Sequence, residues 1–282
     1  MSTLETVVGT ANVLHRMALV VEALDAVTGQ RVRANLRIDR EVDPLLLPPG
    51  RRDLPLLPLT PRDVGRALIL FDHTVPTVPV RLRIWDPERR HAPRRFDLPL
   101  WTLAEIEAAE AGPPEIGATS RVLRPHLHPG TAWPSPRGTT LIRGRVESGG
   151  VPVRWARVSA VRTGDMPVGH GHADDRGEFV VVLVDTGTLP PPTPSTLSVD
   201  LVVTAPDPAT APDADERDPL ADLGVEPVAR TSSPPLPAEV DNDVLRGVAT
   251  PAGHVPNTAA VPTLVVPTGA ELVLTQPIPF AA

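Results

Sequence analysis

Two pairs of histidines have a spacing that could serve metal binding. His126 and His128, like His170 and His172, are two residues apart, so on an extended strand both side chains of a pair point the same way. Two such pairs could give a zinc ion four nitrogen ligands. Against this, both pairs stand among Pro and Gly residues, no carboxylate follows at a supporting spacing, and neither pair supplies the His-x-x-Glu of a zinc carboxypeptidase. We therefore expect exposed loop histidines, no bound metal and no cofactor.

Other side chains that could do chemistry are scarce. Cysteine and tyrosine are absent and all 27 basic residues are arginine, which excludes thiolate nucleophiles, sulfur-bound zinc and lysine Schiff bases. The sequence contains no Gly-x-Ser-x-Gly elbow and no glycine-rich phosphate loop. Asp174, Asp175 and Glu178 around Gly177 lack the spacing of an EF-hand and predict a tight turn instead. The sequence therefore predicts a protein that is not an enzyme.

The densest positive cluster consists of Arg89, Arg90, Arg94 and Arg95. A nucleic-acid site would need more aromatic stacking partners and a more basic domain, so we expect no nucleic-acid partner. Two interpretations stay open: salt bridges at an interface with another protein, where the planar guanidinium is favoured, and a solvated loop. Trp133, in a Pro-rich stretch, is a second interface candidate, either as an anchor on a partner or docked on its own domain.

Proline and charge divide the chain into segments. With 37 Pro and 20 Gly among 282 residues, long helices are not expected. The net charge of −7 arises mainly between Asp207 and Asp243, where ten carboxylates meet two arginines. Because this segment has few large apolar side chains, it predicts a mobile or loosely draped linker. The sequence has no apolar run of membrane-spanning length and no basic flank of a secretory signal, so we expect a cytoplasmic protein without a membrane partner.

Two stretches of the chain predict the same run of strands. In each stretch a strand, a glycine-containing turn and a return strand with period-2 alternation are followed by two further strands. The matching segments are 17–24 with 139–146, 31–42 with 151–162, 66–72 with 177–185, and 78–87 with 197–208. Trp155 falls in a return strand and is expected in the core. Between the stretches, Thr102 and Glu105 form a capping-box pattern that predicts one short helix.

These patterns predict an all-β protein of two tandem small β-sandwiches with Pro-rich linkers and one short helix. The C-terminal β arm either closes the second sandwich or docks elsewhere. The expected segments are an N-terminal β-sandwich at 1–101, a short helix and Pro-rich linker at 102–138, a second β-sandwich at 139–206, an acidic Pro/Ala-rich linker at 207–260, and the C-terminal β arm at 261–282.

The second sandwich resembles a known family. Gly144-Arg-Val-Glu-Ser-Gly-Gly-Val-Pro-Val-Arg-Trp-Ala-Arg-Val, followed by Asp174-Asp-Arg-Gly-Glu-Phe, is similar to the carboxypeptidase regulatory-like domain, a transthyretin-like and Ig-like β-sandwich. The resemblance covers about residues 139–205 and rests mostly on turn glycines and core valines. It implies a fold and a non-catalytic accessory module, and it carries no specific function.

The whole chain is also similar in style to accessory proteins of phage-tail-like contractile injection particles from GC-rich bacteria. The residues that prompt this are 80–100 and the closing Pro277-Ile-Pro-Phe. The resemblance implies a structural component with a cap, baseplate or adaptor role. Its partners would be other protein subunits, copies of itself included, in the cytoplasm or in a released particle. The alternative is a free-standing β-sandwich binding module for carbohydrate or peptide.

Overall fold

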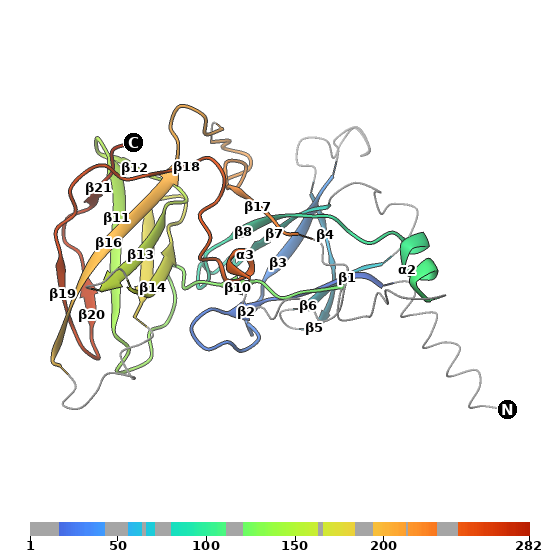
Figure 1. Ribbon diagram of the computed structural model, residues 1–282, viewed down its shortest axis with the longest axis horizontal. Coiled ribbons are helices and arrows are strands. Elements are labelled where there is room, and N and C mark those ends of the chain that lie inside the picture. Colours follow the sequence, from blue (N-terminus) through green and yellow to red (C-terminus); the bar gives the residue numbers. More distant parts are fainter. Residues whose placement is uncertain are drawn as a thin grey trace.

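The computed structural model describes residues 17–42, 56–63, 66–70, 80–110, 121–162, 166–183, 194–212, 214–229 and 242–282. Strands dominate these residues and two short helices accompany them, so the all-β expectation is confirmed. The strands form two halves that lie side by side along the long axis of the molecule (Figure 1). Neither described helix is long and apolar enough to cross a membrane.

The first half consists of two sheets around one apolar core. The first sheet has the strand order β5 (Thr60–Asp63), β6 (Arg66–Leu70), β1 (Met17–Glu22), β9 (Val122–Leu123), and the second has the order β17 (Val225–Pro227), β8 (Arg94–Leu98), β7 (Val80–Trp85), β3 (Arg37–Glu41), β4 (Leu56–Pro58). Leu82, Ile84 and Phe96 are fully buried between them. A short ladder of β2 (Leu24–Asp25) and β10 (His126–Leu127) lies at the end of this half that faces the second half (Figure 1).

The second half is built in the same way. Its first sheet has the strand order β12 (Val151–Pro152), β11 (Leu141–Ser148), β15 (Glu178–Val182), and β20 (Glu271–Val273) and β21 (Ile278–Pro279) also pair with β11. Its second sheet has the strand order β14 (Met166–His172), β13 (Arg157–Arg162), β16 (Thr196–Pro206), and β18 (His254–Pro256) and β19 (Leu264–Pro267) pair with β16. Buried and exposed side chains alternate along β16, as the period of a half-buried strand requires. Its buried side chains pack in one core with those of β11, β13 and β15.

Both halves share one strand-pairing scheme. In the first half β1 pairs antiparallel with β6 and β3 with β7, and in the second half β11 pairs antiparallel with β15 and β13 with β16. A later strand then joins the first one in parallel, β9 on β1 and both β20 and β21 on β11. The repeat seen in the sequence therefore reappears in the order and direction of these strands.

The two return strands are shorter than predicted. Residues 31–36 include buried Val32 and Ala34, but β3 begins only at Arg37. In the second half Arg154 and Trp155 form a turn between β12 and β13, with Trp155 at φ 60°. Trp155 is 4% exposed, so its place in the core is confirmed. The alternating pattern shows which side chains face inward, but it does not show where the backbone leaves its ladder.

The predicted capping box is present at the start of α2 (Leu103–Glu110). The Thr102 hydroxyl accepts a hydrogen bond from the backbone N–H of Glu105 at 3.2 Å, and the Glu105 carboxylate accepts one from the backbone N–H of Thr102 at 2.8 Å. Each side chain thus satisfies a backbone donor that the helix itself leaves unpaired.

The C-terminal arm belongs to the second half. β19 pairs antiparallel with β16, while β20 and β21 extend the sheet of β11. Ile278 and Phe280 are buried in the core of this half. Of the two positions left open for the arm, the structure has the one that closes the second half.

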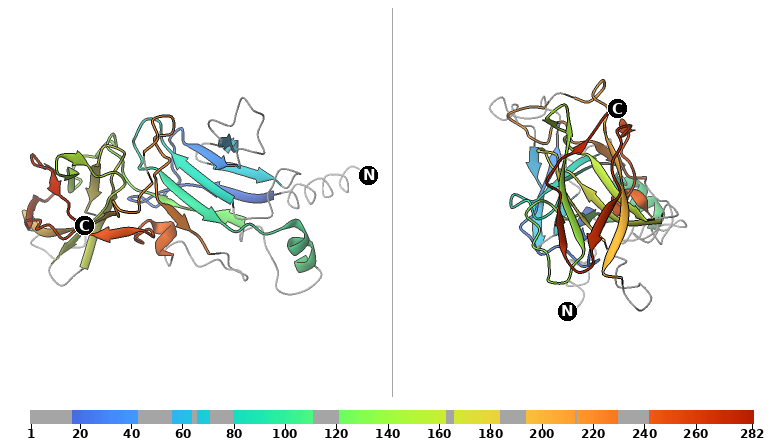
Figure 2. Two further views of the ribbon diagram at one scale, coloured as in Figure 1. Left: turned by 90° about the horizontal axis from the view of Figure 1, so that it is seen from above. Right: turned by 90° about the vertical axis from the view of Figure 1, so that its left-hand side faces the viewer.

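The acidic segment is more ordered than expected. Residues 214–229, here called the acidic strap, lead from the second half back to the first, where β17 pairs in parallel with β8 (Figure 2). Further on, α3 (Asp243–Arg246) lies between the halves and β18 returns to β16 (Figure 1). The prediction of a mobile or loosely draped linker is therefore wrong for residues 214–229. Its carboxylates bind arginines and so compensate for the scarcity of apolar side chains. Residues 111–120 and 230–241 of the two expected linkers lie outside the described residues.

Candidate functional site: a charged junction and its cleft

One carboxylate of the acidic strap joins the two halves. Glu226 accepts hydrogen bonds from Arg94 on β8, at 3.0 and 2.5 Å, and from Arg157 on β13, at 2.9 Å. Arg94 is fully buried and Glu226 is 2% exposed. Burial alone would raise the pKa of the Glu226 carboxyl, but the two arginines outweigh it and lower this pKa to about 2. The group is therefore ionised at neutral pH and bridges cations from opposite halves.

Arg94 also secures the short helix α3. Its guanidinium donates to the carbonyls of His126 and Leu245 at 2.8 and 2.7 Å, and it contacts the Val244 carbonyl as well. A cation beside the last carbonyls of a helix satisfies acceptors that have no partner within the helix. Gly247 then ends α3 in the left-handed conformation, at φ 73°. The charged group and the helix thus hold each other in place between the halves.

The histidine pairs meet at this same junction. The His128 ring lies with Nε2 2.9 Å from the Arg246 carbonyl and Nδ1 3.2 Å from the His170 carbonyl. The His172 ring has Nε2 2.8 Å from the Gly247 carbonyl, and its centroid lies 4.3 Å from that of His128. Burial lowers the pKa of His128 to about 3, and burial also lowers the pKa of His172 well below its ordinary value. Both rings are therefore neutral at pH 7.

The expectation of exposed loop histidines is wrong for this junction. His128 and His172 are buried, and His126, His170 and His172 stand on strands β10 and β14. The four residues do come together from both halves, but the nitrogens of His128 and His172 face backbone carbonyls, and His170 Nδ1 lies 2.9 Å from the Ser159 hydroxyl. Across the described ranges, no group of three or more His, Cys, Asp or Glu side chains is arranged to hold a metal ion. The spacing of the histidine pairs in the sequence indicated that both pairs could lie at one place, and in the structure their contacts there help to hold the junction together.

The arginine cluster binds partners within the same chain. Arg89, in the turn between β7 and β8, donates to Asp174 at 2.9 Å and to Asp175 at 2.7 Å in the second half. Arg95 donates to Glu41 and to two strap carbonyls, and Arg90 lies 2.6 Å from Glu88. Arg89 thus connects the two halves and Arg95 contacts the strap, while an interface of the cluster with another protein stays a prediction.

The turn that receives Arg89 forms as predicted. The Asp174 carboxylate accepts backbone hydrogen bonds from Arg176 at 2.8 Å and from Glu178 at 3.1 Å, and Gly177 has φ 72°. A short acidic side chain that caps its own turn is a common device in loops. Here it also aims the carboxylate at the first half.

The strap is bound by arginines from both halves. Arg83 of β7 donates to Asp218 at 2.7 and 2.5 Å, and Arg154 of the second half donates to Asp222 at 2.5 and 2.8 Å. Arg154 also donates to the Pro219 carbonyl at 2.7 Å. Several carboxylates of the segment that looked mobile therefore meet a guanidinium at a fixed place.

Trp133 is not an exposed anchor. It is 7% exposed and packs on Leu141, Val180 and Val182 of the second half. Arg143 donates to its backbone carbonyl at 2.9 Å and holds the Pro-rich stretch against β11. Of the two predicted alternatives, docking on its own domain is the one observed.

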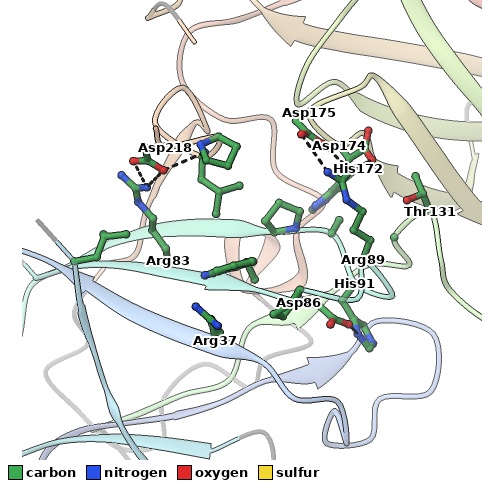
Figure 3. Close-up of a pocket in the computed structure, with 18 of the residues that line it drawn as sticks. Arg37, Arg83, Asp86, Arg89, His91, Thr131, His172, Asp174, Asp175 and Asp218 are labelled. Atoms are coloured by element: carbon green, nitrogen blue, oxygen red, sulfur yellow. Dashed lines mark hydrogen bonds and ion pairs between the residues drawn. The ribbon is translucent and has the colours of Figure 1, made fainter. Parts of the chain in front are cut away.

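A cleft of about 420 Å³ opens between the two halves and the acidic strap (Figure 3). Two ion pairs, Arg83 with Asp218 and Arg89 with Asp174 and Asp175, stand at either side of it. The lining residues come from β3, β4, β7, the turn before β8, residues 130–131, the second half and the strap. Sequence reasoning missed this cleft, because its walls are distant in the chain and no local pattern joins them.

Comparison of the chain with protein-family models, with curated proteins and with solved structures finds no match. The resemblances to the regulatory-like domain and to injection-particle proteins therefore stay predictions.

Proposed function

We propose that this protein is a non-catalytic structural component of a larger assembly, built from two tandem Ig/transthyretin-like β-sandwiches. Within that class, a cap, baseplate or adaptor role in a bacterial phage-tail-like contractile injection particle is our specific proposal. Its partners are other protein subunits.

The observation that carries the proposal is the buried Arg94–Glu226–Arg157 group. It fixes the orientation of the halves through one carboxylate, and removing one partner of such a buried group leaves an uncompensated charge. Arg89 adds a second connection between the halves through its ion pairs with Asp174 and Asp175. A subunit that sets the distance between its neighbours in an assembly needs such stiffness, because any bending between its halves would displace those neighbours.

Sedimentation of a native lysate of the producing cells through a density gradient tests this proposal. Each fraction is probed for the protein, and the proteins of its peak are identified by mass spectrometry. We expect a fast-sedimenting peak that contains the subunits of an injection particle. A protein that stays near the top, at the position of a 30.0-kDa chain, contradicts the assembly role.

A matched pair of variants makes this test specific for the junction. Glu226→Gln removes the charge that joins the halves, and Glu107→Gln makes the same chemical change on the exposed face of α2. We expect Glu226→Gln to leave the fast peak in part or completely and Glu107→Gln to remain in it. Equal retention of both variants would show that the assembly does not need the fixed junction.

A free-standing binding module for carbohydrate or peptide is the second candidate, and the cleft of about 420 Å³ is the observation in its favour. This function predicts a monomer near the top of the same gradient. A ligand that stabilises that monomer, with no other protein in the peak, would favour the binding module over the structural component.

A further inference from the structure

The cleft beside the strap has the size, walls and charge of a small-molecule site. We propose that it binds a small carboxylate with a flat apolar body, of the aromatic-acid class. This inference goes beyond the proposed structural role and does not rest on it, because a subunit and a free monomer would carry the same cleft.

Size and location are the first argument. At about 420 Å³ the cleft falls within the range of about 300–1,000 Å³ found for small-molecule sites, which often lie between domains. Much of its lining is apolar, including Leu56, Trp85, Pro93 and Leu220. Apolar walls with a few polar groups favour a ligand that buries a hydrophobic body and directs one charged group.

Trp85 provides a flat surface of fixed orientation. Its indole Nε1 donates to Asp39 at 3.0 Å, and this bond fixes the ring at the end of β7. Arg37 is the residue directly opposite on β3, and its guanidinium carbon lies 5.2 Å from the ring centroid. Because this guanidinium lies over the indole ring, a planar ligand body would pack on the indole beside it, with its carboxylate turned towards Arg37.

Two arginines of the cleft without a carboxylate partner among the described residues favour an anionic ligand. Arg83 and Arg89 are already bound to aspartates, and Asp86 lies 3.3 Å from His91. Arg37 and Arg217 also line the cleft, both are exposed, and neither has a carboxylate partner within the described part of the chain. The four arginines and four aspartates of the lining balance in charge, but two of the aspartates share Arg89, so within this lining the guanidiniums of Arg37 and Arg217 are left without a carboxylate. A carboxylate is the group that such a guanidinium binds in a bidentate way.

The cleft is formed before any ligand arrives. The Arg83–Asp218 pair holds the strap at one side, and the Arg89 pairs with Asp174 and Asp175 hold the second half at the other (Figure 3). Walls that are already fixed lower the ordering cost of binding. We therefore expect a measurable affinity for a ligand of modest size.

Isothermal titration of the full chain with 2-naphthoate and with the neutral 2-naphthamide tests the proposal. We expect one 2-naphthoate per chain, bound at least about ten-fold more tightly than the amide, the ratio that one charge-assisted contact typically provides. Arg37→Gln should weaken 2-naphthoate about ten-fold and leave the amide unchanged. Arg33→Gln, the same change at an exposed arginine outside the cleft, should bind like the natural chain. Binding at Trp85 is read from its indole N–H signal in NMR spectra, which Trp85→Phe identifies.

Three results would overturn the proposal. The first is no saturable binding of 2-naphthoate in the millimolar range. The second is equal binding of acid and amide, or of natural chain and Arg37→Gln. The third is tighter binding of glucuronate than of 2-naphthoate, which would assign the cleft to acidic sugars. If Arg37→Gln fails to fold, Arg217→Gln takes its place with the same expected loss.

Discussion

At the scale of single residues, the junction depends on groups whose charge state is set by their surroundings. Glu226 is ionised because it lies between Arg94 and Arg157, and His128 is neutral because it is buried beside the same arginines. The ionised carboxyl and the neutral ring are consistent with each other, because Arg94, Arg157 and Glu226 together already carry one more positive than negative charge. A further proton on the histidine would add a second positive charge with no counterion nearby.

The stability of the junction should depend on the Glu226 carboxylate. Glu226→Gln leaves two buried arginines without a counterion, and we expect the free energy of unfolding to fall by about 3 kcal/mol or more. Urea denaturation at pH 7 measures this, with the exposed Glu107→Gln as control, for which we expect a change within about 0.5 kcal/mol. A loss for Glu226→Gln as small as that of the control would mean that the group contributes little.

Acid should destabilise the protein through His128. Its pKa is about 3 in the folded chain and 6.5 ordinarily, so between these values the unfolded chain binds a proton that the folded chain does not. Stability therefore falls as the pH falls from 6.5 towards 3, by on the order of 3 kcal/mol at pH 4 from this group. Glu226 acts in the same direction below its ordinary pKa of 4.5.

Urea midpoints measured from pH 7 to pH 4 test this dependence. His128→Gln has no proton to take up in that window, so its stability should fall less than that of the natural chain. Parallel curves for the two proteins would exclude His128 as the origin of the acid sensitivity.

At the scale of elements, α3 is too short to be stable alone and is held by its surroundings. Its C-terminal glycine lies against both histidine rings: a Cβ at Gly247 would come 3.0 Å from His128 and from His172. The helix, the rings and Arg94 therefore pack as one unit. A change at the glycine should disturb all three.

Two alanine substitutions separate backbone strain from this packing. Gly247→Ala and Gly253→Ala both place alanine at positive φ, 73° and 79°, but a Cβ at Gly253 meets nothing within 4 Å. We expect Gly253→Ala to cost about 1 kcal/mol and Gly247→Ala clearly more, because it must also displace a ring. Thermal unfolding of both variants measures the difference. Equal losses of stability in the two variants would show that the His128 and His172 rings can move aside without an energetic penalty.

The elements also show what sequence can and cannot predict. Short apolar runs bounded by turns identified the strands around Val20, Ile142 and Val199, and the capping box identified α2, because these signals lie within a few residues. The strap carried no such signal. Glu226 is 132 positions from Arg94 and 69 from Arg157, so its carboxylate looked unpaired in the sequence. The four histidines were singled out, but only the fold shows that the ring nitrogens of His128 and His172 face backbone carbonyls.

At the scale of the whole molecule, the chain passes between the halves more than once. It builds most of the first half, then the second, returns through the acidic strap to add β17, and ends in the second half with β18 to β21. Neither half is complete without a segment that lies beyond the other in the sequence. The two cores are separate, but the chain links them as one structure.

One cooperative unfolding transition should follow from this arrangement. Differential scanning calorimetry of the natural chain is expected to give a single peak whose calorimetric and van't Hoff enthalpies agree. Glu226→Gln, which removes the ion pairs of the strap with Arg94 and Arg157, should broaden or split that peak, while Glu107→Gln should not. Two resolved transitions in the natural chain would show that the halves unfold independently.

The late position of β17 has a consequence for synthesis on the ribosome. β8 ends at Leu98 and its parallel neighbour begins at Val225, so the nascent first half emerges with that sheet edge open. At translation rates of about 5–20 residues per second, this edge stays unpaired for on the order of ten seconds. An unpaired edge invites pairing with other chains, so this interval is when the newly made protein is most exposed to aggregation. The first half, although its first strands are translated first, receives β17 only after β11 to β16 of the second half have been made.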